Sequence, residues 1–250
     1  MAGMTKHQKI ANELRDAIAS GEYPAGALLP AIPELMARYD VARDTVRDAI
    51  AALANEGLVL PRRGVGTVVR ETASVQLGYS ASLAVARTWQ EQAGAGQDEV
   101  VLAEWETADS EIAERLGVDP GSRVVHRTRH FTQGLGVAQI ADQWFPEHIV
   151  VAVRERGAGD LADATRRPDR GTSLFRLLAD AGHAPVEADE TIGTRMPDPM
   201  ERETMELPPG VPVLVTYRIT TDAAGRPVET TTAVGAGDRM SARFRLPLNY

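Results

Sequence analysis

The sequence predicts two folded parts: a small helical part that ends in a β-hairpin, and a larger α+β part with a mainly antiparallel sheet. Three observations predict this division. Apolar residues recur at helical spacing through residues 5–55, two short β-type segments follow, and residues 98–250 mix strand and helix patterns. The length of 250 residues also exceeds that of most single domains. We therefore expect domains at residues 1–70 and 98–250, joined by a linker at residues 71–97.

The composition is that of a folded protein in a reducing compartment. Apolar residues make up 43% of the chain and charged residues 25%, which suffices for a hydrophobic core. The chain has no cysteine, which excludes disulfides, thiolate nucleophiles and cysteine metal ligands. We find no signal peptide and no apolar run near the roughly 20 residues that cross a bilayer. We expect a soluble, cytoplasmic protein without membrane contact.

The first part predicts three helices in close succession. Residues 5–19 form the first helix, with Thr5 as its cap and Gly21 after its end. Residues 32–39 form a short second helix, and residues 42–55 form the third. Only a tight turn separates the second helix from the third, which is typical of a helix-turn-helix.

Two short strands follow the third helix. They span residues 58–60 and 66–69, and the segment between them reads PRRGV. This pattern predicts a β-hairpin with a basic, glycine-containing tip. A hairpin directly after a helix-turn-helix is a wing, so the first domain is expected to be a winged helix-turn-helix, an α domain with a small β wing.

Charge is distributed unevenly along the chain. The net charge of −8 argues, taken alone, against nucleic-acid binding, because phosphate contacts need local positive charge. Residues 1–70, however, hold nine Lys or Arg against eight Asp or Glu, whereas residues 71–250 hold eighteen against twenty-seven. The negative charge therefore belongs to the second part, and DNA binding by the first part remains open.

The third helix carries the residues expected to read DNA. Its apolar residues predict one buried face, which leaves the amino-terminal half of the other face in solvent, where a recognition helix meets bases. Arg43 and Arg47 are four residues apart, and either guanidinium suits the two-pronged contact to guanine. Thr45 suits a phosphate or a thymine methyl group. The DNA-binding candidates are Arg43, Asp44, Thr45, Arg47, Arg62, Arg63, Gly64 and Gly66.

The wing candidates act differently from those of the helix. Arg62 and Arg63 are expected to reach the DNA backbone or the minor groove, and Gly64 and Gly66 let the turn approach the duplex closely. The alternative for the helix is that its arginines only pair with neighbouring acids, such as Asp48, on a solvated face. The two preceding helices and the wing favour DNA binding over this alternative.

Residues 5–70 closely resemble the DNA-binding domain of the GntR family. The segments that carry the resemblance are HQKIANEL (7–14), IASG (18–21), PAG (24–26), LP (29–30), VARDTVR (41–47) and GVGT (64–67). The resemblance implies that Arg43, Thr45 and Arg47 contact operator DNA and that a homodimer binds a short inverted repeat.

Two departures from the family pattern concern helix capping. Members usually have Ser-Glu-Arg-Glu-Leu before the second helix, whereas this chain has AIPEL at residues 31–35 and so lacks the capping serine and a basic residue. One phosphate or base contact is therefore expected to be missing. Ala42 also stands where a capping serine is common, so Asp40 or water is expected to satisfy the first amides of the third helix.

The second part predicts strands that pair with their neighbours in sequence. Residues 124–131 and 137–144 form one expected hairpin, and residues 213–220 and 228–234 form another. Asp198-Pro199-Met200-Glu201 has the cap, the first-turn proline and the acidic third residue that begin a helix. Locally paired strands predict an antiparallel sheet rather than a doubly wound one.

Residues 98–246 resemble the UTRA ligand-binding domain of the HutC-type branch of the same family, which has the chorismate-lyase-like fold. The segments involved are AERLGVDPG (113–121), RTR (127–129), FP (145–146), SL (173–174), Glu201 with Leu207, PPGVPVL (208–214) and GRPVE (225–229). The resemblance implies a small-molecule effector, and members that sense sugar phosphates use residues of the type found in the RTR segment.

Seven residues are candidates for effector binding. Arg127 and Arg129 lie two apart on a strand, so both guanidiniums point to one face and can converge on a phosphate or carboxylate. Thr172 and Ser173 stand at a helix start, whose free amides also favour an anion. The alternative for each is an ordinary surface or strand-pairing role. The remaining candidates, which could hold sugar hydroxyls or an amine, are Glu190, Tyr217 and Glu229.

No motif predicts catalysis, a metal or a cofactor. The histidines at positions 126, 130, 148 and 183 do not have a metal-binding spacing. No nucleophile elbow, phosphate loop or dinucleotide fingerprint is present. We therefore expect no enzyme activity, no catalytic residue, no metal and no cofactor.

The leading hypothesis is a transcriptional repressor whose operator affinity changes when a small polar or anionic metabolite binds, such as a sugar phosphate. Its expected partners are double-stranded operator DNA, the effector and a second copy of the chain. One alternative is a repressor of plasmid or mobile-element transfer without a metabolite ligand. Another is an enzyme related to chorismate lyase, which rests on fold alone.

Overall fold

The computed structural model describes residues 4–70, 75–80, 97–133, 136–157, 159–165 and 174–245. It divides into two compact units. The first unit comprises Met1–Ser74 together with Met196–Pro212 and Ala236–Arg239, and the second comprises Val75–Arg195, Val213–Gly235 and Met240–Tyr250. The domain boundaries expected from the sequence remain a prediction, and each unit is described by itself.

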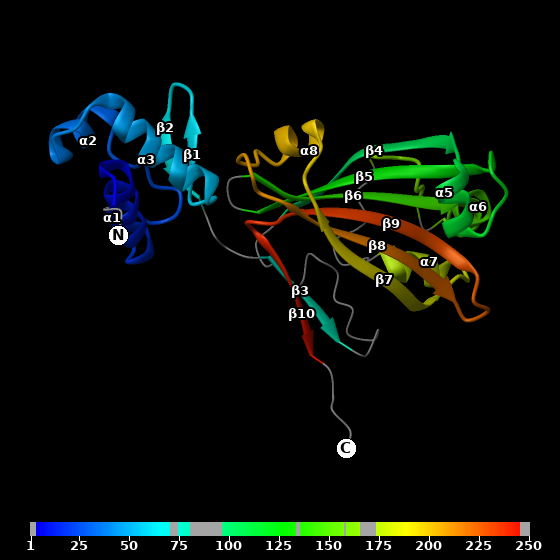
Figure 1. The fold of residues 1–250 in the computed structure, drawn as a ribbon. Coiled ribbons are helices and arrows are strands. Elements are labelled where there is room, and N and C mark those ends of the chain that lie inside the picture. Colours follow the sequence, from blue (N-terminus) through cyan, green and yellow to red (C-terminus); the bar gives the residue numbers. More distant parts are fainter. Residues whose placement is uncertain are drawn as a thin grey trace, which may run out of the picture. The chain divides into compact units, whose positions relative to one another are not determined.

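The first unit contains the expected winged helix-turn-helix (Figure 1). Its helices are α1 (Lys6–Ala19), α2 (Ile32–Tyr39) and α3 (Arg43–Asn55). Strands β1 (Val59–Arg62) and β2 (Gly66–Val69) form the antiparallel wing. The apolar faces predicted for the three helices meet in one core, because side chains three and four apart share a helix face. The fully buried core members include Leu14, Leu35, Val46, Leu53 and Val59.

The helix starts differ in their capping. Thr5 caps α1 as expected: its hydroxyl accepts a hydrogen bond from the Gln8 amide, and the Gln8 side chain accepts one from the Thr5 amide at 2.9 Å. At α2, Ala31 has no capping side chain, but Glu34 Oε2 accepts from the Ala31 amide at 3.0 Å. At α3, Ala42 makes no side-chain cap, and Asp40 instead ends α2 in the left-handed conformation.

The second unit contains a six-stranded antiparallel sheet, as expected. The sheet order is β4-β5-β6-β9-β8-β7. Figure 1 shows these strands as one curved layer. The hairpins β5–β6 and β8–β9 that the sequence predicts lie at its centre. The strand bounds are β4 (Gln97–Thr107), β5 (Arg123–Gln133), β6 (Gly136–Pro146), β7 (Pro185–Arg195), β8 (Val213–Asp222) and β9 (Pro227–Ala236).

Helices pack on both faces of this sheet. Helix α5 (Ser110–Leu116) packs against Val124 and Trp144. Helices α6 (Glu147–Glu155) and α7 (Leu174–Asp180) pack against Val125 and Phe145. Because successive strand residues point to opposite faces, the sheet has an α5 face and an α6–α7 face.

Several elements differ from the expectation. Helix α6 was not expected, because its apolar residues Ile149, Val150 and Val153 include a β-branched run directly after a strand. Strand β3 (Val75–Ser80) lies within the expected linker and pairs in parallel with β10 (Met240–Arg245). Neither strand was expected. The sequence pattern within the linker favours a helix at residues 83–92, and these residues lie outside the part of the chain that the structure describes. Helix α8 (Pro199–Thr204) has its expected capping box of Asp198 and Glu201.

Candidate functional site

The exposed face of α3 presents the helix residues predicted to bind DNA. Arg43, Asp44 and Arg47 are exposed, and Thr45 is half-buried. The face behind them is anchored by Val46, Ala49, Ile50 and Leu53, which are buried as the apolar spacing predicted. A firmly packed helix thus displays two guanidiniums at its amino-terminal end. Their contact with DNA remains a prediction.

The two arginines of the wing differ in exposure and in ion pairing. Arg63 is exposed, whereas Arg62 forms an ion pair with Glu206, with Nη2 2.6 Å from Oε2. Gly64 and Gly66 have φ angles of 79° and 130°, which L-side chains rarely adopt. A Cβ at Gly66 would also lie 3.2 Å from the Leu28 side chain. The tip therefore needs glycine for its backbone, whatever it contacts.

A polar pocket lies on the α6–α7 face of the sheet. Its volume is about 50 Å³, which is room for little more than a water molecule. Arg129 is the only pocket-lining residue that the sequence singled out. The lining residues come from β4, β5, β6, β8 and β9, and they are Asp98, Arg129, Phe131, Gln139, Ala141, Gln143, Thr216, Arg218, Thr231 and Ala233.

Two ion pairs occupy the pocket arginines. Arg129 donates from Nε to Oδ1 of Asp98 at 3.1 Å and also contacts the second carboxylate oxygen. Arg218 on β8 pairs with Glu190, which lies opposite it on β7. Both acids are largely shielded from solvent, so each pair is stronger than an exposed one. The pocket in this conformation is internally neutralised.

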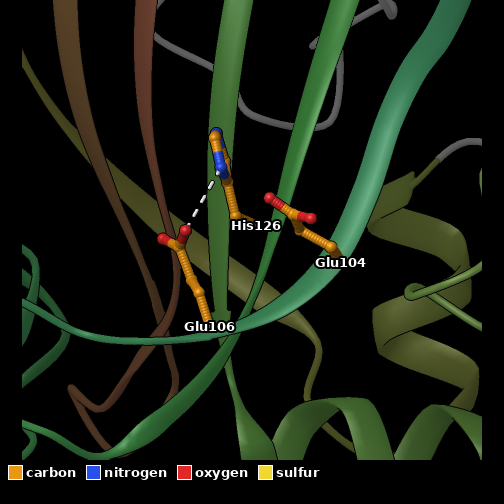
Figure 2. Close-up of side chains that lie close together, drawn as sticks. All are labelled: Glu104, Glu106 and His126. Carbon is orange, nitrogen blue, oxygen red and sulfur yellow. Dashed lines mark ion pairs between the residues drawn. The ribbon is translucent and has the colours of Figure 1, made fainter.

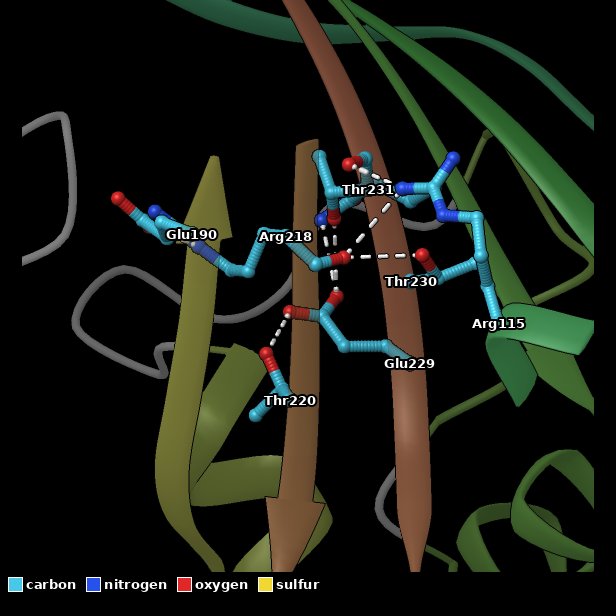
Figure 3. A network of polar contacts seen from close by, with 8 residues as sticks. Arg115, Glu190, Arg218, Thr220, Glu229, Thr230 and Thr231 are labelled. Carbon is cyan, nitrogen blue, oxygen red and sulfur yellow. Dashed lines mark hydrogen bonds and ion pairs between the residues drawn. The ribbon is translucent and has the colours of Figure 1, made fainter. Parts of the chain in front are cut away.

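Glu229 is a fully buried carboxylate beside this pocket. It accepts hydrogen bonds from Thr220 Oγ1 at 3.0 Å, from Gln143 Nε2 at 3.3 Å and from Thr231 Oγ1 at 3.5 Å. Figure 3 shows the carboxylate between Thr220 and Thr231. Neutral donors from three strands therefore hold a buried negative charge in place.

Arg127 supplies a buried positive charge on the same sheet face. The residue is 8% exposed, and its Nε has no hydrogen-bond partner. Burial lowers the pKa of Arg127, and the charge of Glu229 opposes that shift. An arginine remains protonated at neutral pH even so. Arg127 is thus a buried cation with an unused donor. An oxygen of an anionic or hydroxyl-rich ligand can accept the hydrogen bond that this donor offers.

The structure brings together four of the seven effector candidates. Arg127, Arg129, Glu190 and Glu229 share the α6–α7 face of the sheet. Tyr217 does not join them: it points to the α5 face, where the Arg115 guanidinium lies 5.5 Å from its ring centroid. Thr172 and Ser173 lie outside the described residues.

Several pocket residues were missed by the sequence analysis. They occupy alternate positions on buried strands, so a period-two run of polar side chains in β6, β8 and β9 was the available signal. They are Asp98, Gln139, Gln143, Thr216, Arg218 and Thr231.

These features define a transcription regulator that joins a DNA-binding domain to an effector domain. The sequence pattern of the bacterial regulatory proteins of the gntR family matches residues 6–69, and that of the UTRA domain matches residues 92–241. The chain therefore belongs to the GntR family and carries a UTRA effector domain, consistent with the HutC-type branch of that family.

Two curated relatives are similar over most of the chain. The transcriptional repressor PhnF of Mycolicibacterium smegmatis is 30% identical over 244 residues, which cover 94% of this chain and 90% of that protein. The regulator GgaR of Escherichia coli K12 is 29% identical, over 88% of this chain and 83% of that protein.

Two crystal structures share the fold over the whole chain. A GntR-family regulator is 29% identical with a TM-score of 0.58, and covers 98% of both chains. PhnF from Mycobacterium smegmatis is 24% identical with a TM-score of 0.59, over 98% of this chain and 100% of that one. In the part of the chain that the structure describes, every helix is too short or too polar to cross a membrane.

Proposed function

We propose that this regulator is a repressor whose operator affinity is modulated by a small polar or anionic metabolite, such as a sugar phosphate. The observation that carries the proposal is that Arg129 and Arg218 line one polar pocket, with the buried Arg127 on the same face of the sheet. Guanidiniums recognise phosphate and carboxylate groups with two parallel hydrogen bonds. The similarity to PhnF, which is named a repressor, supports the direction of regulation.

Ligand binding has to open the pocket. Its small volume leaves no space for a sugar, and Arg129 and Arg218 are held by Asp98 and Glu190. An anionic group can replace Asp98 as the partner of Arg129, since both present oxygen acceptors to the same guanidinium. Opening the pocket moves the strands that line it, so the free and the bound protein differ in the arrangement of these strands. A ligand can shift a conformational equilibrium only if it binds the two arrangements with different affinity.

In the proposed repressor, α3 of each protomer of a homodimer lies in a major groove of an inverted repeat. Effector binding changes the arrangement of the two recognition helices, so that one half-site no longer fits.

A gel-shift titration on the chain's own upstream DNA, at stated salt, tests the proposal. Each titration is run with and without candidate phosphosugars and amino sugars. The expected result is specific retardation that one class of compound alters. Retardation that no compound alters would instead favour a transfer-type repressor without a metabolite ligand. Absence of retardation would contradict DNA binding itself.

The variant Arg129→Gln separates the pocket from the DNA-binding surface. Losing one charge-assisted contact of about 1.5–3 kcal/mol should raise the effector concentration needed for the response roughly tenfold to hundredfold, while retardation without effector stays unchanged. Arg123→Gln is the matched control, because Arg123 is on the same strand but is exposed and paired with Glu147. An unchanged response in Arg129→Gln would contradict the assignment of the pocket.

The enzyme alternative is tested separately. The relatives named above are transcription regulators, which supports a regulatory role over an enzymatic one. Turnover of chorismate by the purified chain would revive the alternative, and its absence would remove it.

A further inference from the structure

A cluster of one histidine and two glutamates lies on the α5 face of the sheet, opposite the effector pocket. Glu104 and Glu106 come from β4, and His126 comes from β5, where it is the direct antiparallel partner of Glu104. One potential ligand atom from each of the three side chains lies within 4.8 Å of the other two. Figure 2 shows both carboxylates beside the imidazole ring.

The distance between His126 and Glu106 fits two ligands of one metal ion better than a direct hydrogen bond. Nδ1 of His126 lies 3.6 Å from Oε2 of Glu106, which is beyond hydrogen-bond range. Two ligands on a tetrahedral zinc ion, each about 2.0–2.2 Å from the metal, lie roughly 3.3–3.6 Å apart. The observed gap matches one edge of such a tetrahedron. Glu104 is exposed, so its side chain can rotate to close the remaining distance.

Outer hydrogen bonds orient the histidine for this role. Nε2 of His126 lies 2.9 Å from Oδ1 of Asp142. A carboxylate in that position holds the proton on Nε2 and leaves the Nδ1 lone pair directed at the glutamates, which is the arrangement seen behind metal-bound histidines. Trp144 stacks on the imidazole with 4.7 Å between ring centroids and 6° between the planes, which fixes the ring.

The same tryptophan also orients one glutamate. Its indole Nε1 donates to Oε1 of Glu106 at 2.7 Å, which leaves Oε2 as the oxygen nearest to His126. Two of the three inner groups therefore have a dedicated outer partner, Asp142 for the histidine and Trp144 for Glu106. A set of acidic residues on a solvated strand would not have this second layer.

We propose that Glu104, Glu106 and His126 form a binding site for a divalent transition-metal ion such as Zn²⁺. One imidazole nitrogen and two carboxylate oxygens are a donor set that such ions accept. The exposure of Glu104 leaves the remaining coordination positions open to water. The sequence predicted no metal site because only the spacing of histidines was considered, whereas both carboxylates come from the neighbouring strand.

A proton is the competing occupant of this cluster. Burial lowers the pKa of His126, but the hydrogen bond and charge of Asp142 and the charges of Glu106 and Glu104 raise it more, so that this pKa lies above its usual value. Without a metal, the same residues form an imidazolium–carboxylate network. The experiment has to distinguish these two states.

Calorimetric titration of the full chain with ZnCl₂, after treatment with EDTA and desalting, tests the proposal. The expected result is one equivalent of Zn²⁺ bound per chain. Glu104→Gln and His126→Ala should each weaken binding at least about tenfold. Circular dichroism checks the fold of each variant, and Glu104→Gln decides the question if His126→Ala does not fold, since Glu104 is exposed.

Two histidine variants serve as controls. His130→Ala changes a histidine on the same strand and face that takes no part in the cluster. His148→Ala removes one member of the other histidine pair, whose ring centroids lie 5.8 Å apart. Both should bind Zn²⁺ like the unchanged chain. Absence of binding to the unchanged chain would overturn the proposal, and so would Glu104→Gln and His126→Ala variants that bind Zn²⁺ as tightly as the unchanged chain. The readout involves neither DNA nor effector, so it is independent of the proposed function.

Discussion

At the scale of single residues, the two arginines of α3 offer a sharp test of base readout. Among the described residues, neither Arg43 nor Arg47 forms an ion pair with an acidic neighbour, so both guanidiniums remain available to DNA. A two-pronged contact to guanine contributes about 1–3 kcal/mol of discrimination. We expect Arg43→Ala and Arg47→Ala each to weaken operator binding by roughly fivefold to 150-fold in a gel-shift titration.

Arg15→Ala is the control for these two variants. Arg15 is a half-buried arginine on α1 whose Nη2 lies 2.6 Å from Oε1 of Glu56. Its removal changes the net charge by the same amount and leaves the exposed amino-terminal face of α3 unchanged, since Glu56 lies at the other end of that helix. If Arg43→Ala and Arg47→Ala bind the operator with the same affinity as Arg15→Ala, the two arginines of α3 lie in solvent without contacting bases, and the proposed base readout is wrong.

The sequence predicted part of the residue set on the sheet face of the polar pocket, which we propose binds the effector, and the limit has a physical reason. Arg127 and Arg129 were found because alternation along one strand needs no knowledge of its neighbours. Gln143 and Arg218 reach the pocket from β6 and β8. The strand pairing that brings them there cannot be predicted from the sequence of either strand alone. Tyr217 was grouped with the pocket although it points to the opposite face of β8, because the sequence does not reveal which face is which.

At the scale of elements, local signals decided which helices and strands were predicted. Capping side chains mark the starts of helices α1 and α8 in the sequence. Turn residues between the strands mark the hairpins. Helix α6 has no side-chain cap, since it begins directly after Pro146. Strands β3 and β10 pair across most of the chain's length, so neither carries a local signal of its partner.

Arg115 anchors α5 to the sheet and gives a prediction at this scale. Its guanidinium donates to the Thr231 carbonyl at 2.8 Å and to Thr232 Oγ1 at 3.0 Å. Figure 3 shows it reaching the backbone of β8 and β9. Because Arg115→Ala leaves buried acceptors without a donor, we expect the free energy of unfolding of the second unit to fall by about 1–3 kcal/mol. Urea unfolding followed by tryptophan fluorescence measures this, since Trp105 on β4 and Trp144 on β6 lie in that unit.

Two further variants define what the anchor does. Arg115→Lys should restore only part of the stability, because an ammonium cannot match the spread of guanidinium donors. Glu111→Gln tests the ion pair between Arg115 and the exposed Glu111 on the same helix, whose atoms lie 3.8 Å apart, and should change stability by less than about 1 kcal/mol. An unfolding curve of Arg115→Ala that overlays that of Glu111→Gln would show that α5 docks through its apolar residues alone.

At the scale of the whole molecule, a net charge of −8 has to be reconciled with binding to a polyanion. Residues 1–70 are nearly neutral, so binding depends on a few local cations rather than on a general attraction. The two arginines of the wing differ in how available they are for such local contacts. Arg62 is paired with Glu206, which comes from a distant part of the sequence, whereas Arg63 is exposed.

The salt dependence of operator binding distinguishes local from global charge. Each phosphate neutralised by a side chain contributes about −0.9 to the slope of log K against log salt concentration. If Arg63 contacts a phosphate, Arg63→Ala should reduce the magnitude of that slope by about one and weaken operator and unrelated DNA alike. Arg123→Ala removes the same charge from an exposed site in the second unit, and its slope should match that of the unchanged chain. Equal slopes for all three proteins would mean that the wing makes no phosphate contact through Arg63, whereas equal reductions in both variants would mean that the overall charge controls binding.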